Sequence, residues 1–112
     1  MKVLVPVDDS DTSLRAIDWL ARSQPPLAPC EVELLNVRGM PEQFGADLGA
    51  RLRQRALREG QQRVLATALE QAERAGLKQV MIHAAHDRLA EQVVEAAKVQ
   101  GADQIVMAVP SG

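Results

Sequence analysis

The stretch VLVPVDDSDTS, residues 3–13, passes from a short apolar run directly into a series of short polar side chains. The apolar run is rich in valine and too short for a helix, which predicts a buried strand. The polar residues from Asp8 to Asp11 are of the types that cap helix N-termini. Leu14, Ile17 and Ala21 then recur at helical spacing. The chain therefore opens with a strand, a tight turn and a helix.

The same alternation continues to the end of the sequence. Further strands are expected at residues 32–37, 79–84 and 104–109, with helical patterns at residues 48–72 and 89–97 between them. Gly60 interrupts the longer pattern and predicts a local bend, and Gly76 suits its C-terminal end. Strands joined by helix-length connections favour a parallel sheet with helices on both faces. The predicted fold class is therefore α/β, a three-layer α/β/α sandwich.

Composition limits the classes of protein that the chain can represent. The 112 residues suit a single domain, residues 1–112, and the formal net charge of −2 argues against nucleic-acid and membrane-surface binding. Aromatic residues make up 2% of the chain, so platforms for base stacking are absent. The single cysteine excludes an intrachain disulfide. With no apolar run near the roughly 20 residues of a membrane span and no signal-peptide pattern, we expect a cytoplasmic protein.

Ligands of open parallel sheets bind beyond the carboxyl ends of the strands, at the point where the strand order reverses. Asp8 follows the first strand, and with order 3-2-1-4 it would face Ala108 and Val109 across a crevice. Its carboxylate could accept hydrogen bonds from a ribose hydroxyl, or it could only help to cap the following helix. The chain contains neither of the common glycine-rich phosphate motifs, GxGxxG and GxxxxGK[ST].

Other polar residues favour structural roles over chemistry. His83 falls in a predicted strand and His86 in a loop, so the two imidazoles would not face one metal ion, and no metal site is expected. His83 is better explained by a hydrogen-bond partner in or beside the sheet. Cys30 suits a small, buried side chain. No nucleophile or acid–base pair can be assigned, so we expect no catalytic residues and no enzyme activity.

Five arginines gather on the first half of the long helical pattern, with Glu59 as the one acidic residue among them: Arg51, Arg53, Arg55, Arg58 and Arg63. Such a cluster can bind an anionic partner, or it can form an ordinary solvated helix face. The second interpretation is favoured because surface helices usually carry charge on their exposed side.

Two stretches carry a resemblance to a known family. VLVPVDDSDTSLRAIDWLA resembles the opening of the universal stress protein family, and EQVVEAAKVQGADQIVMAV resembles its third helix and fourth strand. The resemblance implies a Rossmann-like sheet of the adenine nucleotide alpha hydrolase type, here with strand order 3-2-1-4. It also implies a homodimer and, in many members, binding of ATP or AMP.

The resemblance assigns five residues to the adenosine half of the family pocket. Asp8 would contact ribose, Pro6, Val7 and Val37 would pack near adenine, and Ala108 stands at the first glycine position of the family's phosphate loop. The G-[ST] element of that loop, the fourth helix and the fifth strand have no counterpart in residues 1–112.

We therefore expect a non-catalytic stress-response or signalling module that acts through dimerisation and an unknown protein partner, with weak or absent ATP binding and no certain cofactor. The alternative is an adenine-nucleotide binding protein, using AMP or ATP with Mg²⁺, whose phosphate loop lies beyond residue 112. The expected dimer contact is the edge of the fourth strand, where the apolar side chains are Ile105, Val106, Met107 and Val109.

Overall fold

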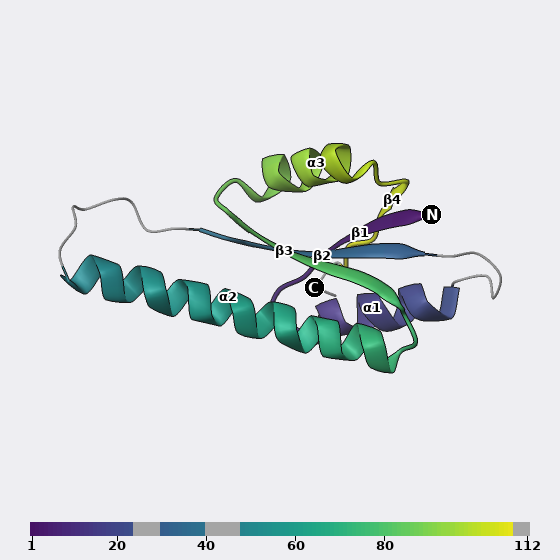
Figure 1. Cartoon of the computed structure of the whole chain (residues 1–112), viewed down its shortest axis with the longest axis horizontal. Helices are drawn as coiled ribbons and strands as arrows, with labels where there is room; N and C mark the ends of the chain where they lie inside the picture. Colours follow the sequence, from purple (N-terminus) through teal and green to yellow (C-terminus); the bar gives the residue numbers. More distant parts are fainter. Residues whose placement is uncertain (24–29, 40–47, 109–112) are drawn as a thin grey trace.

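A computed structural model of the chain describes residues 1–23, 30–39 and 48–108. Its elements alternate along the chain as the sequence predicts: β1 (Lys2–Pro6), α1 (Asp11–Ser23), β2 (Glu31–Arg38), α2 (Leu48–Arg74), β3 (Gln79–His86), α3 (Leu89–Gln100) and β4 (Gln104–Ile105). Helices α1 and α2 lie on one face of the sheet and α3 lies on the other (Figure 1). The predicted α/β/α layering is confirmed.

The four strands form one parallel sheet in the order β3-β2-β1-β4. Val5 of β1 lies beside Leu34 of β2, and Leu34 lies beside Ile82 of β3. On the other side of β1, Leu4 lies beside Ile105 of β4. The sheet therefore has the predicted order 3-2-1-4, with β1 and β2 at its centre.

The fourth strand is shorter than the six residues that the apolar run predicts, because only Gln104–Ile105 pair with β1. The N–H of Val106 donates one further hydrogen bond to the carbonyl of Leu4 at 2.9 Å. The next residue of β1 that faces β4 is Pro6, which has no N–H to donate. The ladder therefore ends there. Val109, which was expected on the same edge, lies outside the described residues.

Two hydrophobic cores hold the layers together, one on each face of the sheet. Alternate residues of each strand point to opposite faces, so Val3 and Val5 join one core while Leu4 joins the other. The larger core lies beneath α1 and α2, and its buried members are Val3, Val5, Val7, Ile17, Leu20, Val32, Leu34, Val64, Leu65, Ala68, Ala72 and Leu77. The smaller core lies beneath α3 and contains Leu4, Leu35, Ala85, Val93 and Ala96.

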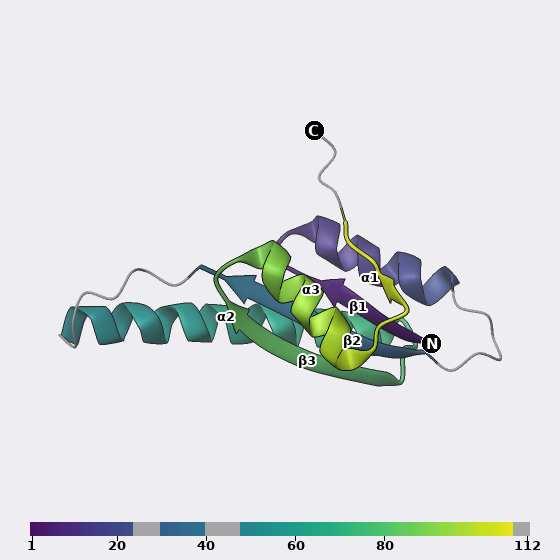
Figure 2. The ribbon, with the colours of Figure 1, turned by 90° about the horizontal axis from the view of Figure 1, so that it is seen from above.

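Helix α2 is one continuous helix, and its N-terminal half extends past the end of the sheet (Figures 1 and 2). The bend expected at Gly60 does not form. Gly76 ends the helix with a backbone φ of 96°, and the N–H of Leu77 donates back to the carbonyl of Ala72 at 3.0 Å. This is the left-handed glycine cap that the sequence predicts.

Within the described ranges, no helix is long and apolar enough to span a membrane.

Candidate functional site

The turn between β1 and α1 is organised around the carboxylate of Asp8. Its Oδ1 accepts hydrogen bonds from the backbone N–H of Ser10 at 2.8 Å, from the hydroxyl of Ser13 at 2.9 Å and from the hydroxyl of Ser10. These bonds, above all the one from the Ser10 hydroxyl, stabilise the charged form and lower the pKa of Asp8. The direct cap of α1 is Ser10, whose Oγ accepts from the N–H of Ser13 at 3.4 Å. Asp8 therefore fixes the turn as an anion, one step before the helix.

A cavity of about 320 Å³ opens beside this turn, beyond the carboxyl ends of β1 and β2 and between α1 and α2. We call it the Asp8 cavity. Its walls come from the β1–α1 turn, from the last residue of β2 and from the middle of α2. The lining residues are Asp8, Asp9, Ser10, Leu14, Arg38, Ala56, Gly60, Arg63, Val64 and Thr67. Two carboxylates and two guanidinium groups thus share one small space.

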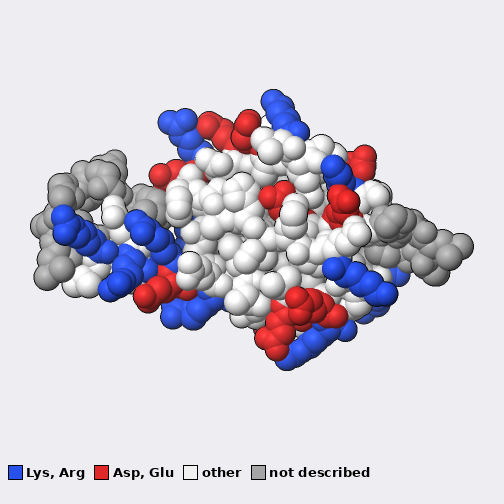
Figure 3. Space-filling view, in the orientation of Figure 1, with Lys and Arg blue, Asp and Glu red and all other residues white. Residues whose placement is uncertain are grey.

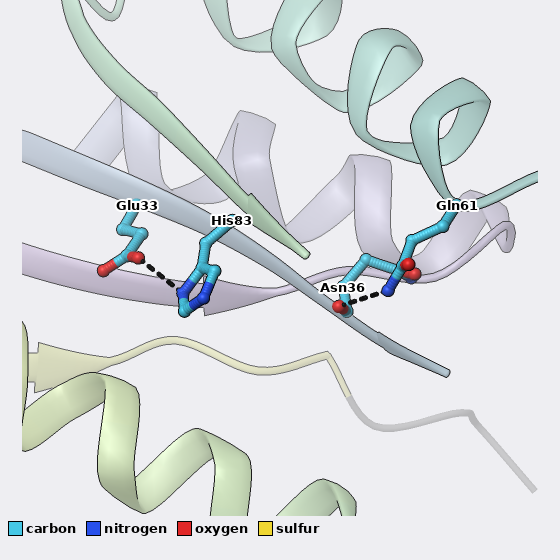
Figure 4. Close-up of polar contacts among 4 residues, drawn as sticks. All are labelled: Glu33, Asn36, Gln61 and His83. Carbon is cyan, nitrogen blue, oxygen red and sulfur yellow. Dashed lines mark hydrogen bonds and ion pairs between the residues drawn. The ribbon is translucent and has the colours of Figure 1, made fainter. Parts of the chain in front are cut away.

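A buried polar contact fixes α2 against the strand ends that border this cavity. The side-chain amide of Gln61 donates to the carbonyl of Asn36 at 2.9 Å (Figure 4). It also donates to the carbonyl of Ala85 at 2.8 Å. The amide of Asn36 donates in turn to the carbonyl of Val7 at 2.7 Å. These bonds join β1, β2 and β3 to the helix that carries the far wall of the Asp8 cavity.

The structure does not bring all five residues of the predicted adenosine pocket into one cavity. Of these five residues, Asp8 is the one that lines the Asp8 cavity. Pro6 at the end of β1 and Val7 just after it are buried, and Val37 packs partly buried against the smaller core on the α3 face. Ala108 lines a different groove, beside α1. Their role in nucleotide binding stays a prediction.

The second groove lies between α1 and the chain that follows β4, and it has a volume of about 550 Å³. We call it the Trp19 groove. It is lined by Thr12, Arg15, Ala16, Trp19, Ile105, Val106, Met107 and Ala108. Three of its apolar members are open to solvent: Trp19 is 53% exposed, Met107 49% and Ile105 46%. Val106 is different, because its side chain packs against the larger core.

The histidines and the cysteine line neither the Asp8 cavity nor the Trp19 groove. His83 Nδ1 is 3.1 Å from Glu33 Oε1 on the neighbouring strand, so the expected partner beside the sheet is confirmed (Figure 4). In the described part of the chain no three histidine, cysteine or acidic side chains come close enough to hold a metal ion. Cys30 is half-buried, and burial raises the pKa of its thiol.

Of the five clustered arginines, Arg51, Arg53, Arg55 and Arg58 are exposed on the N-terminal half of α2, and Arg63 is exposed just beyond it. Figure 3 shows Lys and Arg side chains gathered at that end of the molecule, over α2. Arg63 is the member of this group that lines the Asp8 cavity, whereas Arg55 does not. Arg38 also lines this cavity. It could not be predicted from the sequence, because its place beside Arg63 depends on how β2 packs against α2.

A parallel sheet with order 3-2-1-4 and a cavity at the carboxyl ends of its central strands defines a doubly wound α/β protein. The model of the universal stress protein family matches residues 1–111, and the chain belongs to that family. No curated protein sequence matches the chain.

Solved structures of the family are similar to this chain over almost its whole length. A universal stress protein family member from Burkholderia pseudomallei is 28% identical, with a TM-score of 0.74 over 98% of this chain and 82% of that one. A universal stress protein in complex with cAMP is 22% identical, with a TM-score of 0.70, over 95% of this chain and 74% of that one. An Arabidopsis thaliana family protein with AMP bound is 15% identical, with a TM-score of 0.70, over 99% of this chain and 77% of that one.

Proposed function

We propose that this universal stress protein is a non-catalytic, cytoplasmic stress-response or signalling module that acts through self-association and contact with a protein partner. Its binding of ATP is weak or absent. Asp8, Asp9 and Asp11 place three carboxylates on the β1–α1 turn, and like charges there oppose a triphosphate.

The observation that carries this proposal is the apolar edge formed by β4 and the Trp19 groove. In the described sheet β4 pairs with β1 alone, so its other side presents unpaired backbone groups. An edge of this kind favours pairing with another chain. The exposed Trp19, Ile105 and Met107 lie along it, and tryptophan is among the residues that contribute most to interfaces.

The proposed assembly is a homodimer through this edge, burying at least the roughly 1,000 Å² typical of a biological interface. Met107→Lys places a charge on an exposed position of the edge and should dissociate the dimer, because a buried unpaired charge is costly. Arg55→Ala, on the far end of α2, should leave the dimer intact. Sedimentation equilibrium of both variants at the same concentration makes the comparison. Equal masses for the two variants would contradict the proposed interface.

A second candidate function is adenine-nucleotide binding, and the fixed carboxylate of Asp8 is the observation that favours it. Its Oδ1 is occupied by the serine contacts, whereas the residue as a whole is exposed. A carboxylate held in this way is suited to accept hydrogen bonds from the hydroxyls of a ribose. The similar structures that contain cAMP or AMP support this candidate.

Thermal unfolding with AMP, and separately with ATP and Mg²⁺, tests the second candidate. A ligand at about one hundred times its dissociation constant adds about 2.7 kcal/mol of stability. AMP should raise the melting temperature of the wild type and not that of Asp8→Ala, with Asp103→Ala as the control. A rise of several degrees with ATP and Mg²⁺ would contradict weak or absent ATP binding.

A further inference from the structure

The strand β3 forms the second open edge of the sheet, on the side opposite to β4. In the described sheet β3 pairs with β2 alone, and Figure 2 shows it along the outer border of the sheet. Successive residues of a strand direct their backbone N–H and C=O groups to alternate sides. The N–H of Asp87, directly after β3, donates to the carbonyl of Arg38 on the β2 side. Counting back along β3, the outward-facing backbone groups therefore belong to Val80, Ile82 and Ala84.

This edge lacks the features that usually keep a sheet edge from pairing with another chain. β3 is 8 residues long, and its sequence QVMIHAAH contains no proline, lysine, aspartate or glutamate. Met81 is 60% exposed on the face that α3 covers, and Ile82 is 49% exposed on the opposite face. Long edges with exposed apolar side chains and no charge readily accept a further strand. The β3 edge is therefore a site for an extended segment of another chain.

A cavity of about 400 Å³ lies beside this edge, between α3 and the strands, and we call it the Glu33 cavity. Its walls include the carboxylates of Glu31, Glu33 and Glu95, together with Lys2, Met81 and His83. Three carboxylates thus share the cavity with one lysine and one histidine. Among the ion pairs of the described residues, only that between Glu33 and His83 includes one of these carboxylates. The excess of negative charge favours a positively charged occupant.

The carboxylate of Glu33 lies where a long side chain on an added strand can reach it. The Glu33 side chain is 12% exposed, and its Oε1 is 3.1 Å from Nδ1 of His83 on β3 (Figure 4). Glu33 therefore reaches from β2 toward the edge strand. A strand added to β3 would lie about 4.8 Å beyond it, and the long, flexible side chains of lysine and arginine can cross that distance.

We propose that the β3 edge binds an extended segment of a partner protein in which basic and apolar side chains alternate. The backbone of the segment pairs with Val80, Ile82 and Ala84. Its basic side chains lie on the α3 face and contact the Glu33 cavity, and its apolar side chains lie beside Ile82 on the other face. In strand addition of this kind, backbone hydrogen bonds provide affinity and pockets for alternate side chains provide specificity. The inference rests on the proposed function, whose protein partner it describes, but not on the β4 dimer.

Fluorescence anisotropy with a labelled heptapeptide, Thr-Val-Arg-Val-Arg-Val-Thr, tests the proposal on the intact chain. The wild type should bind this peptide at least about tenfold more tightly than the same peptide with glutamate in place of arginine. Glu33→Gln keeps the size of the side chain and should weaken binding about tenfold, because hydrogen bonds between charged groups are the strong ones. Glu73→Gln removes the same charge from an exposed position on α2 and should change the affinity by less than about twofold.

Two further comparisons test the backbone pairing. The N–H of Ala84 faces outward, so Ala84→Pro removes a donor for the added strand without removing a bond to β2, and the folded variant should lose the peptide. The peptide with every valine and arginine nitrogen methylated keeps its charge but cannot donate to the edge, and it should not bind. Met107→Lys, which should dissociate the β4 dimer, should bind the peptide as the wild type does, so that failure of the two proposals can be distinguished.

Four results would overturn the proposal. The first is no binding of the heptapeptide at about 1 mM protein. The second is equal affinity for the methylated and unmethylated peptides, and the third is an equal loss in Glu33→Gln and Glu73→Gln, which would be an effect of general charge. The fourth is a lower mass of Ala84→Pro than of the wild type without peptide, which would show that a second copy of this chain occupies the edge.

Discussion

Gln61 of α2 reaches across the end of the sheet and donates to the backbone carbonyl of Asn36 at 2.9 Å, inside the protein, with only 2% of Gln61 exposed. The same amide also donates to the carbonyl of Ala85 at 2.8 Å. One side chain thus donates to two carbonyls near the ends of β2 and β3. It also holds in place the part of α2 that carries Gly60 and Arg63, and so determines the shape of the Asp8 cavity.

Replacing Gln61 should be among the most destabilising changes to a polar residue in this chain. Gln61→Leu keeps the size of the side chain but removes its hydrogen bonds to the carbonyls of Asn36 and Ala85, at a cost of about 1–3 kcal/mol. Urea unfolding measures the change in the free energy of unfolding. Gln62→Leu, at the exposed neighbouring position, should stay within about 0.5 kcal/mol of the wild type. Similar values for the two variants would show that the Gln61 contacts contribute little.

Gly60→Ala should stabilise the protein. Alanine is favoured over glycine inside a helix by about 1 kcal/mol, and Gly60 lies within α2. A new Cβ would meet the ends of the Arg38 and Arg63 side chains at 3.6–3.8 Å, which is ordinary contact. The melting temperature should rise by a few degrees. A lower melting temperature would mean that the space beside Gly60 is needed for folding.

Acid should destabilise the fold partly through Asp8. Its pKa is lowered in the folded state, first by the hydrogen bond from the Ser10 hydroxyl, from an ordinary value of 3.8. A lowered folded-state pKa means that its contribution to stability is present above the unfolded value. That contribution is lost as the pH falls below about 3.8 toward the folded value.

Urea unfolding between about pH 6 and pH 2.5 detects this contribution. Asp8→Asn cannot titrate, so its stability should fall less steeply with acid than that of the wild type. Asp9→Asn, which leaves the serine contacts of Asp8 in place, should follow the wild-type curve. Parallel curves for wild type and Asp8→Asn would contradict the role given to the Ser10 and Ser13 contacts.

Much of the fold could be predicted because strands and helices here carry distinct local patterns. Apolar runs mark β1, β2 and β3, of valine and leucine in the first two and of valine, methionine and isoleucine in β3, and Gly76 marks the end of α2. The length of β4 could not be predicted, because it depends on the register that places Pro6 opposite its continuation. The bend expected at Gly60 does not form, because packing of the rest of α2 against the sheet keeps the helix continuous.

Only the parts of the candidate site that are formed by residues close together in the sequence could be predicted. Asp8 follows directly after a strand, so its position at the carboxyl end of the sheet can be inferred from the sequence. Asn36 and Gln61 left a weaker signal, as polar residues at positions where the strand and helix periodicities place apolar ones. The proximity of Arg38 and Arg63 left no signal in the sequence, because the two are brought together only by the packing of β2 against α2.

The mass of the protein in solution tests the central claim, self-association through the β4 edge, most directly. Static light scattering of the wild type at tens of micromolar should give about twice the monomer mass of 12.2 kDa. Ile105→Lys, at the exposed end of β4, should reduce that mass to the monomer value while the protein remains folded. A wild-type mass of 12.2 kDa at these concentrations would contradict the account.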